Sequence, residues 1–233
     1  MCAFCFAQEN GVVIYTIAHS WSKKFASCDY ISKAQRDREA YVWSNDYERK
    51  EKAELKFNAT ESRYDKKPDD ESRWRQDNDY FIYRDRAKNE MLDIMSVLNK
   101  DYAIRDSIVC QNWKIKNDMK EVAGRICMNA SCYDSLKGKE VIAWFALDLP
   151  IPAGPDRYCG LPGLILELNE ANGAVVYTAT SIIFSEEKME IQKPEVKKKR
   201  KVINIQEYNK IVSKFIEECK KMQRPHFWYG MDF

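Results

Sequence analysis

The sequence lacks several features that would point to particular classes of protein. It has no apolar run close to the ~20 residues that cross a bilayer, so we predict no transmembrane segment. Its 38 basic and 36 acidic residues leave a net charge of only +2, which gives no overall attraction to nucleic acid. With two histidines in the chain, the spacing of potential zinc ligands is also poor. We therefore expect no nucleic-acid partner, no metal and no cofactor.

Cysteines, in contrast, are frequent. Apart from Cys2 and Cys5, the chain contains six: Cys28, Cys110, Cys127, Cys132, Cys159 and Cys219. Six cysteines allow too many pairings for the connectivity to be deduced. In an exported protein some would form disulfides, whereas in the cytosol they would be buried thiols, and both alternatives stay open. Our candidates for a disulfide or a buried thiol are Cys127 and Cys159. Cys127 and Cys132 fall on opposite faces of a predicted strand, so we expect no bond between them.

The N-terminus resembles part of an export signal. Residues 1–8, "MCAFCFAQ", contain a short apolar patch, and Ala7-Gln8 suits a small-residue cleavage site. The positive region is missing and the apolar stretch is short, so a frayed apolar terminus is the alternative. We favour a truncated signal-peptide remnant. This predicts an exported protein of the periplasm or cell envelope, whose residues 9–233 form a single domain.

That domain shows the alternating or short apolar runs of β-strands. The runs are "VVIYTI" after Gly11, "AELKFNATESRYD", "YFIYRD", "EMLDIMSV", "YAIRDSIV", "EVAGRICMNASCYD", "VIAWFALDLP" and "AVVYTATSIIF". The nearly continuous "VIAWFALDLP" suggests a strand covered on both faces, and "NEANG" a hairpin turn. The pattern predicts an α+β fold: mainly antiparallel β, one large curved, half-barrel-like sheet.

Helices are predicted at two places. Residues 31–42 are weakly helical, whereas 204–223 repeat apolar side chains at three- and four-residue intervals. Asn204 and Glu207 form a capping-box pattern before this C-terminal amphipathic helix. Residues 66–79 read as an exposed charged loop, and the basic run 197–201 as a solvated linker.

The most distinctive stretch is "GPDRYCGLPGLILELNEANG", residues 154–173. It is not a phosphate-binding loop, because Leu164 and Ile165 follow Gly163 where lysine and Ser or Thr are needed. Its prolines and glycines instead predict a rigid corner, with Pro162-Gly163 at the centre of a type II turn, that leads into a buried strand over 164–168. The corner is either architectural or also lines a binding surface.

The candidate binding or structural residues cluster around this corner. They are Trp144, Asp148, Pro150, Gly154, Pro155, Tyr158, Gly160, Leu161, Pro162, Gly163 and Glu167. Glu167 ends an apolar run, where a partly buried carboxylate would need a partner, although an acid at a strand end can also face water. Aromatic residues on the central strands would line an apolar pocket if the curved sheet is hollow.

Four segments carry a resemblance to a known family. They are "NWKI" (112–115), "GRICMNA" (124–130), "IAWFALDLPIPAGPDRY" (142–158) and "GLPGLILE" (160–167). Together they resemble the GLPGLI family, a group of exported bacterial proteins. The resemblance implies export and, more weakly, an association with an outer-membrane receptor or transporter system. The family has no assigned activity or catalytic residues, so none is carried over.

Two functions remain. The leading hypothesis is a non-catalytic cell-envelope protein that binds an apolar ligand, a peptide or a receptor partner on its curved sheet. The alternative is an envelope hydrolase that uses a cysteine or a carboxylate. For the thiol version, Cys127 or Cys159 would need a base such as His19 or His226 within hydrogen-bond reach.

Overall fold

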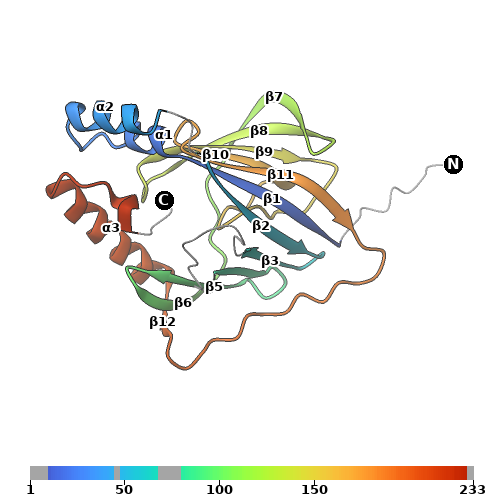
Figure 1. The fold of residues 1–233 in the computed structure, drawn as a ribbon. Coiled ribbons are helices and arrows are strands. Elements are labelled where there is room, and N and C mark those ends of the chain that lie inside the picture. Colours follow the sequence, from blue (N-terminus) through green and yellow to red (C-terminus); the bar gives the residue numbers. More distant parts are fainter. Residues whose placement is uncertain (1–9, 45–47, 68–79, 230–233) are drawn as a thin grey trace.

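The described residues of the computed structural model, 10–44, 48–67 and 80–229, form one large sheet with helices at one end (Figure 1). The strands are β1 (Gly11–Ser20), β2 (Glu48–Phe57), β3 (Glu61–Lys66), β4 (Phe81–Asp85), β5 (Glu90–Val97), β6 (Lys100–Asp106), β7 (Lys114–Val122), β8 (Arg125–Asp134), β9 (Lys139–Ala146), β10 (Leu164–Glu170), β11 (Val175–Phe184) and β12 (Lys201–Ile203). The helices are α1 (Trp21–Ala26), α2 (Lys33–Val42), α3 (Ile205–Lys221) and the 3₁₀-helix η1 (His226–Tyr229).

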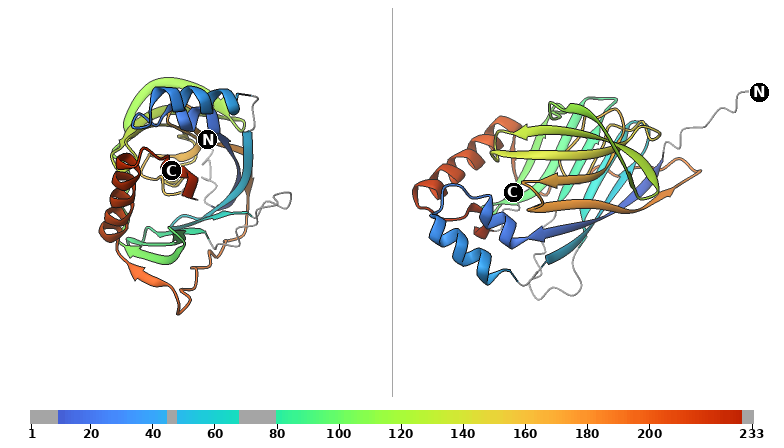
Figure 2. Two further views of the ribbon diagram at one scale, coloured as in Figure 1. Left: turned by 60° about the vertical axis from the view of Figure 1, so that its left-hand side comes forward. Right: turned by 90° about the horizontal axis from the view of Figure 1, so that it is seen from above.

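The sheet is open and strongly curved. Its strand order is β12-β6-β5-β4-β3-β2-β1-β11-β10-β9-β8-β7, and every pair is antiparallel except β12 with β6. Figure 2 shows the sheet bending around the interior, with α3 on the side where its two edges approach each other. The predicted fold class, a mainly antiparallel curved sheet with a C-terminal helix, is confirmed.

The inner face of the sheet builds the core. On β1 the side chains of Val13, Tyr15 and Ile17 are fully buried and alternate with half-buried neighbours, as expected where one face of a strand packs inward. Aromatic and aliphatic side chains from β2, β3, β9, β10 and β11 join the same cluster. Burial of this large apolar surface is the main driving force for the fold.

The outer face is covered on one half of the sheet. The chain between β11 and β12, residues 185–200, passes along the side of the sheet that holds β5 and β6 (Figure 1), and its apolar side chains pack on β4, β5 and β6. Its Ile191 is buried against Tyr83 and Leu92, and Arg63 donates to the carbonyl oxygen of Gln192 at 3.0 Å. This second layer explains why β4 and β5 are buried on both faces instead of alternating.

Two local features differ from expectation. The run "AELKFNATESRYD" is not one strand, because Asn58 Oδ1 accepts hydrogen bonds from the backbone N–H of Thr60 (2.9 Å) and Glu61 (2.6 Å) and turns the chain. It is therefore split between β2 and β3. The short helix α1 was not predicted, although the Ser20 side chain accepts from the N–H of Lys23 and caps it.

The C-terminal helix is confirmed. α3 begins after Asn204, whose side chain forms the predicted capping box with Glu207. The solvated-linker interpretation of 197–201 is wrong at its end, because Arg200 is 7% exposed and Lys201 opens β12. Of the predicted loop 66–79, Lys66 ends β3 and residues 68–79 lie outside the described part, as do residues 1–8.

Candidate functional site

The candidate site is built on the segment between β9 and β10, residues 147–163, which we call the corner. Leu149, Ile151, Tyr158 and Leu161 from this segment belong to the core cluster, so the corner packs into the interior. Backbone hydrogen bonds fix its course: the N–H of Leu164 donates to Leu149 at 2.9 Å, for example. The predicted corner that leads into a buried strand is present.

Two glycines of the corner occupy positions that a larger residue could not take without strain or overlap. Gly163 does not have a positive φ, so the predicted type II turn at Pro162-Gly163 is wrong. Gly163 is needed because a β-carbon there would lie 2.1 Å from the carbonyl oxygen of Ala146. Gly160 has the left-handed conformation, with φ +92°, and its backbone packs closely against Cys110. Two backbone segments can therefore approach each other where side chains would keep them apart.

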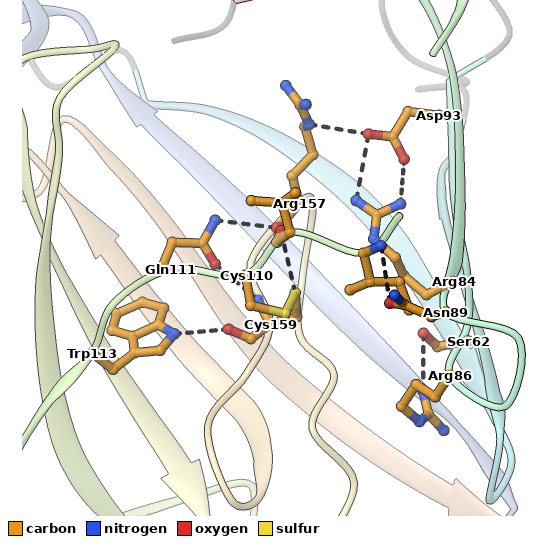
Figure 3. Close-up of a disulfide and its surroundings, with 12 residues drawn as sticks. Ser62, Arg84, Arg86, Asn89, Asp93, Cys110, Gln111, Trp113, Arg157 and Cys159 are labelled. Atoms are coloured by element: carbon orange, nitrogen blue, oxygen red, sulfur yellow. Dashed lines mark hydrogen bonds and ion pairs between the residues drawn. A yellow bond between two sulfur atoms is a disulfide. The ribbon is translucent and has the colours of Figure 1, made fainter. Parts of the chain in front are cut away.

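A disulfide anchors the corner to the segment before β7. Cys159 is bonded to Cys110, 49 positions earlier in the chain. Gln111 Oε1 accepts from the N–H of Cys159 at 3.1 Å, and Trp113 Nε1 donates to the carbonyl oxygen of Cys159 at 2.8 Å (Figure 3). The corner is thus held by one covalent bond and by hydrogen bonds on both sides of that bond.

Beneath the anchored corner lies a cavity of about 300 Å³. Its floor is the inner face of β2 to β4 and the turn after β4: Leu55, Ser62, Tyr64, Ile82, Arg84, Arg86 and Asn89. Its roof comprises residues 152–154 and 156–160 of the corner, together with Ile108 and Cys110. Leu55, Tyr64 and Ile82 pair across the three strands as an apolar row, and Ser62 pairs with Arg84 in the next row.

Charged groups are buried at one side of the cavity. Arg84 forms a two-point hydrogen-bonded pair with Asp93, and Arg157 Nε lies 3.1 Å from the same carboxylate (Figure 3). Asp93 is fully buried and has lost its hydration, so its charge is compensated by the two guanidinium groups. The Arg157 guanidinium also lies 4.3 Å from the ring centre of Tyr208, which connects the cavity wall to α3.

The roof contributes a carboxylate, Asp156, which accepts a hydrogen bond from the hydroxyl of Tyr80. At the floor, the Tyr64 hydroxyl has no hydrogen-bond partner within the part of the chain that the structure describes. Burial, followed by the charge of Asp156, raises the pKa of Tyr64 well above its usual value. Tyr64 therefore stays neutral at physiological pH.

A second buried polar group lies deeper in the interior. Tyr158 donates to Glu170 Oε1 at 3.0 Å, and Lys137 Nζ lies 3.2 Å from Glu170 Oε2. Glu170 is 1% exposed. Sequence reasoning missed this acid and selected Glu167, because the two carboxylates of "ELNE" look alike until strand register places one of them inside.

Some of the predicted binding residues lie away from the cavity, on the outer face of the sheet. Glu167 accepts from Lys120 Nζ at 2.6 Å, and this ammonium lies 4.5 Å from the Trp144 ring. Trp144 is only half-buried, so β9 is not covered on both faces as predicted. Asp148 is exposed and pairs with Arg125 at 2.7 Å. These residues lie apart from the cavity.

The corner residues themselves divide in the same way. Gly154, Tyr158, Cys159 and Gly160 line the cavity. Pro155, Leu161 and Gly163 are buried behind it, whereas Pro150 and Pro162 are exposed. The cavity residues that sequence reasoning missed include the polar and charged Tyr64, Arg84, Arg86, Asp156 and Arg157. The sequence signal for such residues is a charged side chain within an apolar strand, as in "FIYRD". A charged side chain that is buried there requires a partner.

The cysteine and histidine positions bear on the thiol hydrolase. Cys159 is in the disulfide. Cys127 is a buried thiol that is not bonded to Cys132. The sulfur of Cys127 donates to the carbonyl oxygen of Arg125 at 3.6 Å. Burial raises the pKa of Cys127 to about 11, so it is protonated at neutral pH. His226 bonds to the Tyr30 hydroxyl at 2.6 Å, and His19 lies 3.7 Å from a carboxylate on β2. The thiol version therefore loses its nucleophile.

Within the described residues, no group of three or more potential metal ligands is found. No helix in the same ranges has both the length and the hydrophobicity to cross a membrane.

Comparisons with known proteins identify similar folds. A family model described as a protein of unknown function (Porph_ging) matches residues 133–167, from the end of β8 through the corner to Glu167. No curated protein matches the chain in sequence. Two solved structures of PNGF-II, in space groups C2 and P21, have TM-scores of 0.56 and 0.55 at 14% identity and cover 88% of this chain. The chain spans only 32% and 33% of those PNGF-II chains, so the likeness concerns the fold.

Proposed function

We propose that this protein is a non-catalytic binding protein of the cell envelope that holds a small, largely apolar molecule beneath the disulfide-anchored corner. The observation that carries the proposal is the cavity of about 300 Å³ between the inner face of the sheet and the corner. This volume is at the lower end of the range of small-molecule sites. An apolar floor of Leu55, Tyr64 and Ile82 supplies the contact area, and a few polar groups would orient the ligand.

The anchored roof supports binding in a further way. Because the disulfide and the contacts of Gln111 and Trp113 hold the corner before any ligand arrives, little ordering entropy is lost on binding.

The same disulfide supports the proposed location. Disulfides persist in exported proteins and are rare in the reducing cytosol, so the Cys110–Cys159 bond fits the periplasm or cell envelope. The resemblance of the corner to the exported GLPGLI family agrees with this location. An outer-membrane receptor or transporter system would be a partner of a carrier there.

The test uses phenylnaphthylamine, an uncharged fluorescent ligand, with the oxidised protein. Ile108 lines the cavity and is half-buried, whereas its neighbour Val109 is 52% exposed and does not line it. We expect saturable binding to the wild type and to Val109→Trp, and a loss of at least about tenfold in affinity for Ile108→Trp, whose larger ring fills the cavity. Circular dichroism checks that both variants fold.

Mass spectrometry of organic extracts from the same three proteins provides a second measurement. We expect a co-purified small molecule in wild type and Val109→Trp at a higher level than in Ile108→Trp. Equal probe binding by all three proteins would contradict binding beneath the corner, and with it the proposed function. Absence of both probe binding and extractable ligand would overturn the carrier function.

A further inference from the structure

The cavity floor has a polar end and an apolar end. Ile82 and Arg84 lie two positions apart on β4 and both face the cavity, and Arg86, in the turn that follows, also lines it. Ser62 on β3 lies beside Arg84 by strand register, and Asn89 completes the polar end. Each of these polar side chains can donate hydrogen bonds. A ligand lying along the floor therefore meets apolar groups at one end and a cluster of donors at the other.

Arg84 forms an ion pair, whereas Arg86 forms none within the described residues. Arg84 and Arg157 share the buried Asp93, as described above. Arg86 contacts neutral oxygens: it donates to the carbonyl oxygens of Asn58 (2.6 Å) and Glu61 (3.4 Å) and to Ser62 Oγ (3.4 Å). It contacts no carboxylate within the described residues. A partly buried guanidinium without a carboxylate is favourably placed to receive an anion.

Nearby carboxylates are engaged elsewhere. The side chain of Glu61 accepts from the Tyr83 hydroxyl, and Asp85 accepts from Lys88 Nζ at 2.8 Å. Glu61 and Asp85 are each one position away from Ser62 and Arg84 on their strands. Their side chains therefore lie on the other face of the sheet. Asp156, on the roof, is bound by Tyr80. Burial lowers the pKa of Arg86, and the charges of Glu61 and Asp85 oppose this shift only in part, so the guanidinium is incompletely compensated.

Resting on the proposed function, we propose that the ligand is an amphipathic organic anion. Its acidic head, a carboxylate or an equivalent oxyanion, binds Arg86 with Ser62 and Asn89, and its apolar body lies over Leu55 and Ile82. The guanidinium provides charge-assisted hydrogen bonds to the head. The disulfide-anchored corner covers the body.

The test compares two probes with the same ring system: anilinonaphthalene sulfonate, which carries an anionic group, and the uncharged phenylnaphthylamine. We expect the sulfonate to bind at least about tenfold more tightly to the wild-type protein. Arg86→Met should remove this preference while phenylnaphthylamine binding stays within about twofold. The matched control is Arg63→Met, which removes one positive charge from the opposite face of β3, where Arg63 pairs with Asp65 at 2.9 Å.

A second variant guards against misfolding of Arg86→Met. Asn89→Asp keeps the shape of the side chain and the acceptor for the N–H of Ile108, but adds a negative charge at the polar end. It should weaken sulfonate binding by at least about tenfold and leave the uncharged probe unaffected. Binding is measured with and without sodium sulfate at matched ionic strength, to separate an organic anion from an inorganic one.

The outcomes separate the two proposals. Equal affinity of the two probes, or equal loss of sulfonate binding in Arg86→Met and Arg63→Met, would overturn the anionic head and leave the apolar carrier intact. Displacement of the sulfonate probe by inorganic sulfate at equal concentration would overturn the role of the apolar body. Probe binding that Ile108→Trp does not reduce would contradict the proposed function itself.

Discussion

Gly163 offers a direct test of how the corner is held. A β-carbon at this position would lie 2.1 Å from the carbonyl oxygen and 2.8 Å from the carbonyl carbon of Ala146. These atoms belong to the end of β9, where Ala146 pairs with Cys127 on β8 and with Leu164 on β10. Because the obstacle is paired backbone and not the end of a flexible side chain, Gly163→Ala forces strands apart.

The expected cost follows from that overlap. Forcing an extra carbon into a packed interior costs typically 1–3 kcal/mol, and a clash with paired backbone is at the upper end, so we expect about 3 kcal/mol. At roughly 2–4 °C per kcal/mol for a chain of this size, the melting temperature should fall by roughly 6–12 °C. Gly124→Ala is the control: φ is +75°, but nothing lies within 4 Å of the added carbon, so conformational strain alone should cost about 1 kcal/mol.

Thermal and urea unfolding of the oxidised proteins, followed by circular dichroism, would measure both effects. Backbone conformation considered alone ranks Gly124→Ala as the more damaging change, whereas close packing ranks Gly163→Ala first. A loss of stability for Gly163→Ala that is no larger than the loss for Gly124→Ala would refute the packing argument.

Two other predictions concern covalent and ionic contacts. Reduction of the Cys110–Cys159 bond, which closes a loop of 49 positions, should lower the free energy of unfolding by about 4 kcal/mol in the chain-entropy model, and a melting temperature unchanged by reductant would contradict this. Glu170→Gln should cost about 3 kcal/mol in urea unfolding, because Lys137 loses a buried carboxylate. Glu167→Gln, at a half-exposed ion pair, should cost under ~1 kcal/mol, and equal costs would show that burial does not decide the difference.

Some of the site could be predicted from local pattern. Asn204 and Glu207 predicted the start of α3, and the β-branched and aromatic run over 12–17 predicted β1. The prolines and glycines of the corner predicted a rigid turn before a buried strand, and Tyr158 and Gly160 do line the cavity. Such features depend on residues a few positions apart, so composition and spacing are sufficient.

The charged half of the cavity was not predictable in this way. Arg84 and Asp93 each interrupt an apolar run, which signals that a partner is required but does not identify it. Register between β4 and β5 brings them together, and the corner adds Arg157 from much later in the chain. The same limit explains the error at Gly163, where the obstacle is the backbone of a neighbouring strand.

By itself, the sequence determined the strand-rich class, most of the elements and the place of the corner before a buried strand, because backbone preferences and hydrophobic periodicity act over a few residues. Tertiary structure alone decided which cysteine joins Cys159, that Glu170 and not Glu167 is fully buried, and that three arginines border one cavity. Those outcomes depend on register and curvature, which bring together groups that are distant along the chain.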